Sequence, residues 1–315
     1  MTINRRDFIT LGAAGIGSTV LSGAVPLCAA ETCNGMPNLS LPSQPAELHI
    51  GCHQTLVAGK SFEEKLDFLE SAGYDRMEVS GGNYEWMTKN VEAFSKAIKG
   101  RKIRYSNLCI GQRGNAGMAD ATERRAVIDT GKIVLDHAAA LKAEGMILCP
   151  ARKKIELPFP ELRERFLSEI VPELAAHAAK LGVNVILEPL NRTETMFLRQ
   201  VADGASICRD ANRPGIGVMG DFWHMTFEET SDMGAFISAG SFLKHVHIAS
   251  RKNRKIPGLD GEADVYIDGF KGLKLLGYRG AISIEAGYPK DTSDEEKKKL
   301  LIKAAELIKT QWAKA

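Results

Sequence analysis

The sequence predicts a single-domain (β/α)8 barrel, and three observations support this fold class. Eight short β-type runs alternate with helical patterns between residues 48 and 315. This length is close to the ~250 residues that is typical of eight strand–helix units closed into a barrel. The first run is followed by Gly51-Cys52-His53-Gln54, whereas an open, doubly wound sheet usually carries a glycine-rich phosphate turn at that point.

The expected strands are short apolar runs bounded by turn residues, which is the pattern of buried strands. They are residues 48–53, 76–80, 103–109, 145–149, 183–188, 216–221, 244–249 and 281–285.

Helical patterns with capping residues separate the strands. The first helix opens with Ser61 and Glu64 at capping-box spacing and ends at Gly73. A stripe of apolar residues over 162–181 predicts one continuous helix, and weaker patterns cover 197–211 and 226–239. The inward-facing residues expected of the last helix are Leu300, Ala304, Leu307 and Ile308.

The first thirty residues have the pattern of an export signal. Arg5 and Arg6 precede Phe8, an apolar stretch follows, and small residues end the segment at Ala30. Paired arginines in this setting resemble a twin-arginine signal, which a receptor reads as an address. The alternative is a buried N-terminal helix, which the four glycines of the apolar stretch would weaken.

These patterns divide the chain into three parts. We expect a twin-arginine-type signal peptide at 1–30, a proline-containing linker at 31–46 and the barrel at 47–315. The protein is therefore expected to be exported, to the periplasm, by the route that carries folded proteins.

The composition excludes several classes of protein. Hydrophobic residues make up 44% and charged residues 25%, which is ordinary for a globular chain and rules out general disorder. With 41 Lys and Arg against 39 Asp and Glu, no basic surface for nucleic acid is expected. Beyond the first thirty residues no apolar run reaches the ~18 residues of a membrane span, so no stable membrane insertion is expected after processing. The six cysteines show no zinc spacing and are expected to be free thiols.

Four successive strands of the expected barrel end in residues that bind metals. The strand over 183–188 ends in Glu188, and the next three carry Asp221, His247 and Glu285 at or near their ends. Reactive residues of such barrels lie at the carboxyl ends of the strands. Buried carboxylates need a partner, and one divalent cation would satisfy all three.

Three oxygen ligands and one nitrogen ligand suit Mn²⁺, Co²⁺ or Mg²⁺, with Zn²⁺ as an alternative. The competing interpretation is a ring of ion pairs between these acids and Arg or Lys side chains at the barrel mouth.

The sequence around these positions resembles the xylose-isomerase-like sugar (phosphate) isomerases and epimerases, over roughly residues 48–313. The motifs that carry the resemblance are Glu188-Pro189-Leu190-Asn191-Arg192-Thr193-Glu194, Gly220-Asp221-Phe222-Trp223-His224, His245-Val246-His247-Ile248 and the segment from Gly277 to Glu285. The resemblance implies a (β/α)8 barrel that binds one divalent metal through Glu188, Asp221, His247 and Glu285.

The resemblance also implies a reaction. Members of this family abstract a proton next to a sugar carbonyl and pass through an enediolate. One of the two glutamates matching Glu188 and Glu285 removes the proton and the other returns one on the opposite face. Export favours a non-phosphorylated sugar, so we expect a metal-dependent isomerase or epimerase of such a small carbohydrate, and the family often forms homo-oligomers.

Further residues match substrate-contacting positions of the family. They are Glu194, His224, Arg254 and Glu78. The chain departs from the pattern at Ser250, where relatives commonly have Asp or Asn, and this weakens the transfer of substrate contacts.

Other functions remain open from the sequence. The same residues would serve a lyase or hydrolase acting by β-elimination, or a dehydratase, on a 3-keto sugar or glycoside. A non-catalytic sugar-binding protein and an abasic-site endonuclease are further alternatives. The endonuclease needs extra histidines for a trinuclear metal cluster and a phosphate-binding surface, and the near-neutral charge offers no such surface.

Overall fold

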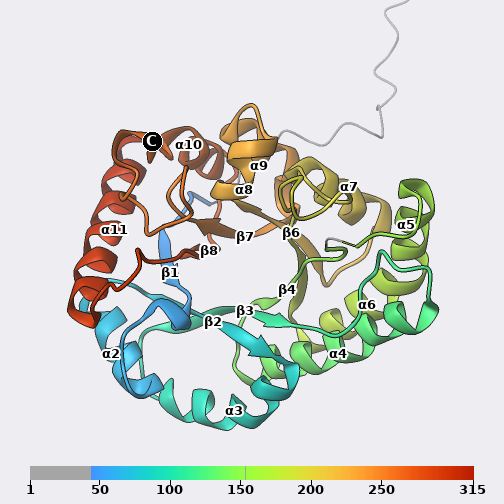
Figure 1. Ribbon diagram of the computed structural model, residues 1–315, viewed down its shortest axis with the longest axis horizontal. Coiled ribbons are helices and arrows are strands. Elements are labelled where there is room, and N and C mark those ends of the chain that lie inside the picture. The colour runs from blue at the N-terminus through green and yellow to red at the C-terminus, as the bar shows by residue number, and fades with distance from the viewer. Residues whose placement is uncertain (1–43, 153) are drawn as a thin grey trace, which may run out of the picture. The chain divides into compact units, whose positions relative to one another are not determined.

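The computed structural model describes residues 44–152 and 154–315, which form an eight-stranded parallel barrel with helices around its outside (Figure 1). The strands are β1 (His49–Cys52), β2 (Arg76–Asn83), β3 (Arg104–Gly111), β4 (Gly145–Leu148), β5 (Asn184–Leu187), β6 (Ile216–Asp221), β7 (Leu243–Ile248) and β8 (Ala281–Ile284). All eight predicted strands are present, and the predicted fold class is confirmed.

The barrel closes between its first and last strands. β1 pairs with β8 in parallel, so the blue first strand lies beside the red last strand in Figure 1. β1 and β2 meet through the single bridge His53↔Glu78. The ring is therefore nearly continuous, and the carboxyl ends of all eight strands converge on one face.

The helices cover the outer surface of the strands. They are α2 (Phe62–Ser71), α3 (Tyr84–Ala97), α4 (Ala121–Ala140), α5 (Phe159–Arg165), α6 (Val171–Leu181), α7 (Val201–Ala211), α8 (Phe222–Glu228), α9 (Asp232–Ala239), α10 (Ile267–Leu275) and α11 (Asp294–Lys314). Ser61 caps α2 as expected, because its hydroxyl accepts a hydrogen bond from the Glu64 backbone N–H at 3.2 Å.

Two helical predictions need correction. The helix expected over 162–181 runs without a break, but it is not a regular α-helix, because a π-helical turn at Phe166–Ile170 joins α5 to α6. Pro172 follows this turn, and a proline cannot donate the hydrogen bond that would continue a regular helix. In α11, Ala304 and Ile308 are buried as expected, whereas Leu300 and Leu307 are only half-buried. Leu301 and Ala305 complete the buried face in their place.

The expected signal peptide lies outside the described residues, as does the expected linker except for residues 44–46. Residues 44–46 precede β1 without regular structure. Within the described part of the chain, no helix has the length and apolar character needed to span a membrane.

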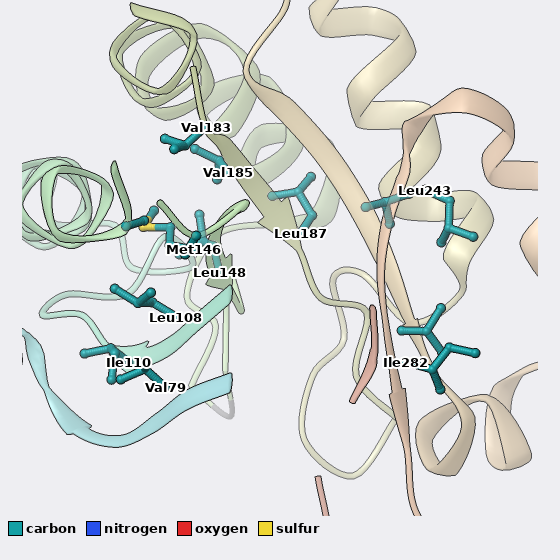
Figure 2. Close-up of a cluster of buried hydrophobic side chains, with 14 of the residues drawn as sticks. Val79, Leu108, Ile110, Met146, Leu148, Val183, Val185, Leu187, Leu243 and Ile282 are labelled. Carbon is teal, nitrogen blue, oxygen red and sulfur yellow. The ribbon is translucent and has the colours of Figure 1, made fainter. Parts of the chain in front are cut away.

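Side chains alternate between the two faces of the strands. Met146 and Leu148 of β4, and Val185 and Leu187 of β5, belong to the large apolar core shared with the helices (Figure 2). The intervening residues of β4, β5 and β6 form a separate small cluster, which consists of Ile147, Ile186 and Met219. This alternation has a period of two residues. It brings the next inward positions to the barrel mouth, where they are Cys149, Glu188 and Asp221.

The packing of α11 on the barrel makes a testable prediction about adjacent residues. Leu301 is fully buried, whereas Ile302 is 40% exposed. We expect Leu301→Ala to lower the free energy of unfolding by about 2–5 kcal/mol, because it leaves a cavity in the core. The control Ile302→Ala should change it by less than about 1 kcal/mol. Urea unfolding followed by circular dichroism measures both, and equal losses would contradict the observed face of α11.

Candidate functional site

Four side chains from successive strands meet at the carboxyl face of the barrel. Glu188 directly follows β5, Asp221 ends β6, His247 is the penultimate residue of β7, and Glu285 directly follows β8. One ligand atom from each lies within 4.8 Å of the others. Asp221 and His247 are also paired across β6 and β7. The structure thus brings together all four residues that the sequence singled out for a cation.

The orientation of His247 decides what this cluster can hold. Its Nδ1 lies 3.1 Å from Glu285 Oε2 and 3.6 Å from Glu188 Oε1. This buried Nδ1 nevertheless makes no hydrogen bond within the described structure. On the other side of the ring, Nε2 is 2.9 Å from Glu78 Oε1. A buried ring nitrogen facing carboxylates without a hydrogen bond is the arrangement expected of a metal ligand.

The donor set fits a divalent cation that accepts both oxygen and nitrogen ligands. Three carboxylates and one imidazole suit Mn²⁺, Co²⁺, Mg²⁺ or Zn²⁺. The competing ring of ion pairs is represented in the described structure by Arg254. Its Nη2 donates to Glu285 Oε2 at 2.7 Å and to Asp221 Oδ2 at 3.3 Å. Arg254 contacts only the carboxylates and leaves His247 Nδ1 without a hydrogen bond. The ion pairs therefore do not satisfy all four residues as a bound cation would.

The cluster concentrates negative charge. Burial alone would lower the pKa of His247, but the carboxylates of Glu78 and Glu285 outweigh burial and raise it well above its ordinary value. Burial would raise the pKa of Glu285, but the charge of His247 and its contact with Glu285 hold that pKa well below its ordinary range. Glu285 is therefore ionised, which favours binding of positive charge.

Glu78 occupies a different environment from the one expected. The family resemblance suggested a substrate contact, but Glu78 is fully buried inside the barrel. Its Oε1 lies 2.9 Å from His247 Nε2 and 3.1 Å from His53 Nε2, and its Oε2 lies 2.8 Å from His245 Nε2. Both carboxylate oxygens are thus engaged by imidazoles. An acceptor at Nε2 keeps the ring proton there and directs the lone pair of Nδ1 toward the acids.

Arg254 is held over the cluster by a tight turn after β7. The turn is closed by Ser250, whose N–H donates to the Lys255 carbonyl at 2.7 Å and whose hydroxyl accepts from the Lys255 N–H at 2.9 Å. Arg254 itself has a positive φ of 50°, a conformation that ordinary residues rarely adopt. Its guanidinium stacks 4.5 Å from the Trp223 ring centre. Ser250, the departure from the family pattern, therefore braces the loop that presents Arg254.

His224 also lies at this mouth and has a defined tautomer. Its Nδ1 accepts hydrogen bonds from the Asn191 backbone N–H at 3.1 Å and from the Asn191 side chain at 2.9 Å. The proton must therefore be on Nε2, which lies 3.6 Å from Asp221 Oδ2 and 3.4 Å from Arg254 Nη2. His224 thus presents an N–H to the same space as Arg254.

Glu194 lies between two arginines at the same mouth. Its carboxylate lies 3.9 Å from Arg254 Nη1 and 3.3 Å from Arg152 Nη2. Three of the four expected substrate contacts, Glu194, His224 and Arg254, therefore lie close together beside the cation cluster. Glu78 instead contacts the opposite edge of the His247 ring.

Three residues at the site were missed by sequence reasoning. Arg152 pairs with Glu194, Asn191 orients His224, and Cys149 donates its thiol hydrogen to Glu188 Oε2 at 2.9 Å. Asn191 lies within the motif from Glu188 to Glu194, and Cys149 is the last residue of a predicted strand. Both positions could therefore have been assigned to the barrel mouth from the sequence. Arg152 lies in a loop with no motif to mark it.

The fold and the site together define a (β/α)8 barrel with an acidic cation site at the ends of its last four strands. Residues 66–311 match the family model described as the xylose isomerase-like TIM barrel. The chain therefore belongs to the xylose isomerase-like TIM barrel family, and the resemblance drawn from the motifs is confirmed.

Characterised relatives of this chain are sugar epimerases. A ketose 3-epimerase of Arthrobacter globiformis is 27% identical over 255 residues, which is 76% of this chain and 83% of that protein. A 3-dehydro-D-guloside 4-epimerase of Escherichia coli (strain K12) is 26% identical over 248 residues, covering 76% and 92%. The apo crystal structure of a 3-keto-D-glucoside 4-epimerase from E. coli has a TM-score of 0.73 at 21% identity, covering 82% of this chain and 100% of that chain. This structural similarity shows that the two chains share the barrel fold.

The contact between Glu78 and His247 can be tested by metal binding. In Glu78→Gln an amide NH₂ can face His247 Nε2, which would move the ring proton to Nδ1. We expect the affinity for Mn²⁺ or Co²⁺ to fall by about 10–100-fold, as for other residues that orient a metal-binding histidine. Isothermal calorimetry measures the affinity, with Glu85→Gln on the surface of α3 as the control. Unchanged affinity in folded Glu78→Gln protein would show that Glu78 does not set the tautomer.

Proposed function

We propose that this protein is a divalent-metal-dependent epimerase of a non-phosphorylated keto sugar. The observation that carries the proposal is the placement of both Glu188 and Glu285 next to His247 Nδ1, at 3.6 and 3.1 Å. Two carboxylates from strands separated by β6 and β7 can approach a bound sugar from different sides, as epimerisation requires. The epimerase activities of the relatives support the same reaction class.

The proposed ligands of the metal are Glu188, Asp221, His247 and Glu285. When bound, the metal would polarise the sugar carbonyl and make the neighbouring C–H more acidic. We propose Mn²⁺, Co²⁺ or Mg²⁺, because the donor set is mainly carboxylate oxygen.

The chain's own residues would divide the proton transfers between them. One of Glu188 and Glu285 removes the proton beside the carbonyl, and the other delivers a proton to the opposite face. Glu188 is 4% exposed and holds the Cys149 thiol hydrogen on Oε2, which leaves Oε1 facing the cluster. The Glu285 side chain is 24% exposed and is held by Arg254. A positioned general base contributes roughly 10²–10⁴-fold to such a step.

Arg254 and His224 would orient the substrate. Both present N–H donors to the space beside the cluster, where sugar hydroxyl or carbonyl oxygens can accept them. Glu194 lies across from Arg254 and can accept a hydroxyl hydrogen. This combination of donors and acceptors suits an uncharged polyol.

The proposal is tested by following solvent deuterium into a panel of keto sugars. We expect Glu188→Gln and Glu285→Gln to fold but to lose exchange by at least about 100-fold, because each removes a proton-transfer group. Glu164→Gln on the exposed surface of α5 is the matched control. Chelation of the metal should abolish exchange and added Mn²⁺, Co²⁺ or Mg²⁺ should restore it. Retained exchange in both variants would show that other residues act as the bases, and release of a β-leaving group would favour a lyase instead.

We also propose that the protein is exported to the periplasm by the twin-arginine route. The support is the pair Arg5 and Arg6 ahead of an apolar stretch. In Arg5→Lys combined with Arg6→Lys, we expect the full-length chain to accumulate in the cytoplasm, because the receptor reads the paired arginines. Cell fractionation and immunoblotting measure this, with Arg213→Lys as a surface control. Normal export of the double variant would contradict the route.

A further inference from the structure

A cavity adjoins the proposed active site on the side of β3 and β4. It has a volume of about 370 Å³, and its walls include Cys109, Gln112, Cys149 and Arg152. None of the four cation-cluster residues lines it. Its size alone falls within the ~300–1,000 Å³ of complete small-molecule pockets. The cavity is therefore large enough for a chemical group beyond the reacting carbons of a sugar.

Two thiols form the boundary between this cavity and the site. Cys149 lines the cavity and donates to Glu188 Oε2 at 2.9 Å. Cys109 also lines it, and its sulfur lies within 4.8 Å of a ring nitrogen of His53 and an oxygen of Glu78. A substrate whose reacting carbons lie between Glu188 and Glu285 would therefore extend past Cys149 into the cavity.

Glycines form part of the cavity wall. Gly82 and Gly111 contribute walls without side chains. Gly82 has a φ of +72°, and a Cβ there would lie 2.8 Å from the Trp86 ring.

The polar groups of the cavity favour an uncharged, hydroxylated occupant. Gln112 uses its NH₂ on the carbonyls of Ile110 and Ile147, at 2.6 and 3.3 Å, which leaves Oε1 to accept a hydrogen bond. Arg152 offers N–H donors and is 59% exposed, and Glu194 at 3.3 Å offsets its charge. An anionic group such as phosphate would meet Glu194 beside Arg152 and would give Gln112 Oε1 no donor. Hydroxyl groups satisfy both residues, because a hydroxyl both donates and accepts.

We propose that this cavity binds a second, neutral sugar ring, so that the substrate is a keto sugar joined by a glycosidic bond to another hydroxylated unit. The short hydroxylated tail of a free ketohexose would fill only part of the volume, which holds roughly a dozen waters at ~30 Å³ each. This inference rests on the proposed function, since it takes the reacting ring to lie at the cation cluster.

The test compares three substrates that share one reacting ring: 3-keto-glucose, its methyl glycoside and a 3-keto disaccharide. Deuterium exchange from solvent gives kcat/KM for each with the metal-loaded protein. We expect the disaccharide to exceed the methyl glycoside by at least tenfold. In Arg152→Ala the ratio of the two values should fall about tenfold, which corresponds to one hydrogen bond from a charged donor. Arg113→Ala, a neighbouring exposed arginine paired with Glu85, should leave the ratio unchanged.

Equal or better exchange of the methyl glycoside or of a free ketohexose would overturn the inference and leave the epimerase proposal intact. Absence of exchange with every keto sugar would instead count against the proposed function. In that case calorimetric titration with the unoxidised disaccharide decides the cavity's role. Saturable binding that weakens about tenfold in Arg152→Ala supports the second-ring site, and the absence of binding overturns it.

Discussion

Three carboxylates confined beside one imidazole are the constraint on which the rest of this structure depends. Glu188, Asp221 and Glu285 lie within one small volume at the barrel mouth, where buried ionised groups are unfavourable unless they are compensated. A closed barrel is suited to impose this arrangement, because the carboxyl ends of its strands converge from all sides. The surrounding residues either supply positive charge, as Arg254 does, or fix the ring that completes the set, as Glu78 does.

The barrel and the four strand-end residues could be predicted because both follow from local pattern. Alternation with a period of two places Glu188 two positions after Ile186, at the mouth rather than in the outer core. The environment of Glu78 could not be predicted in this way. Its partner His53 directly follows β1 and its partner His247 lies on β7, and only closure of the barrel brings these two side chains to Glu78 on β2.

The loops after β7 and β8 act as one support for the site. Lys255 and Gly287 form a parallel bridge between them, and the Gly287 N–H donates to the Arg254 carbonyl at 2.9 Å. The unusual backbone of Arg254 is thus held from two loops, which is how a residue persists in a sparsely populated conformation. Ser250 fits this arrangement, since its hydroxyl accepts a hydrogen bond from the Lys255 N–H within the turn.

The thiol of Cys149 has a consequence for the durability of the site. Burial, together with the adjacent charge of Glu188, raises the pKa of Cys149 well above its ordinary value, so the sulfur stays protonated. Peroxides and disulfides react with the thiolate form and only slowly with an unionised thiol. The thiol that contacts Glu188 is therefore expected to resist oxidation in oxidising surroundings, although cysteine is usually among the side chains that oxidise most easily.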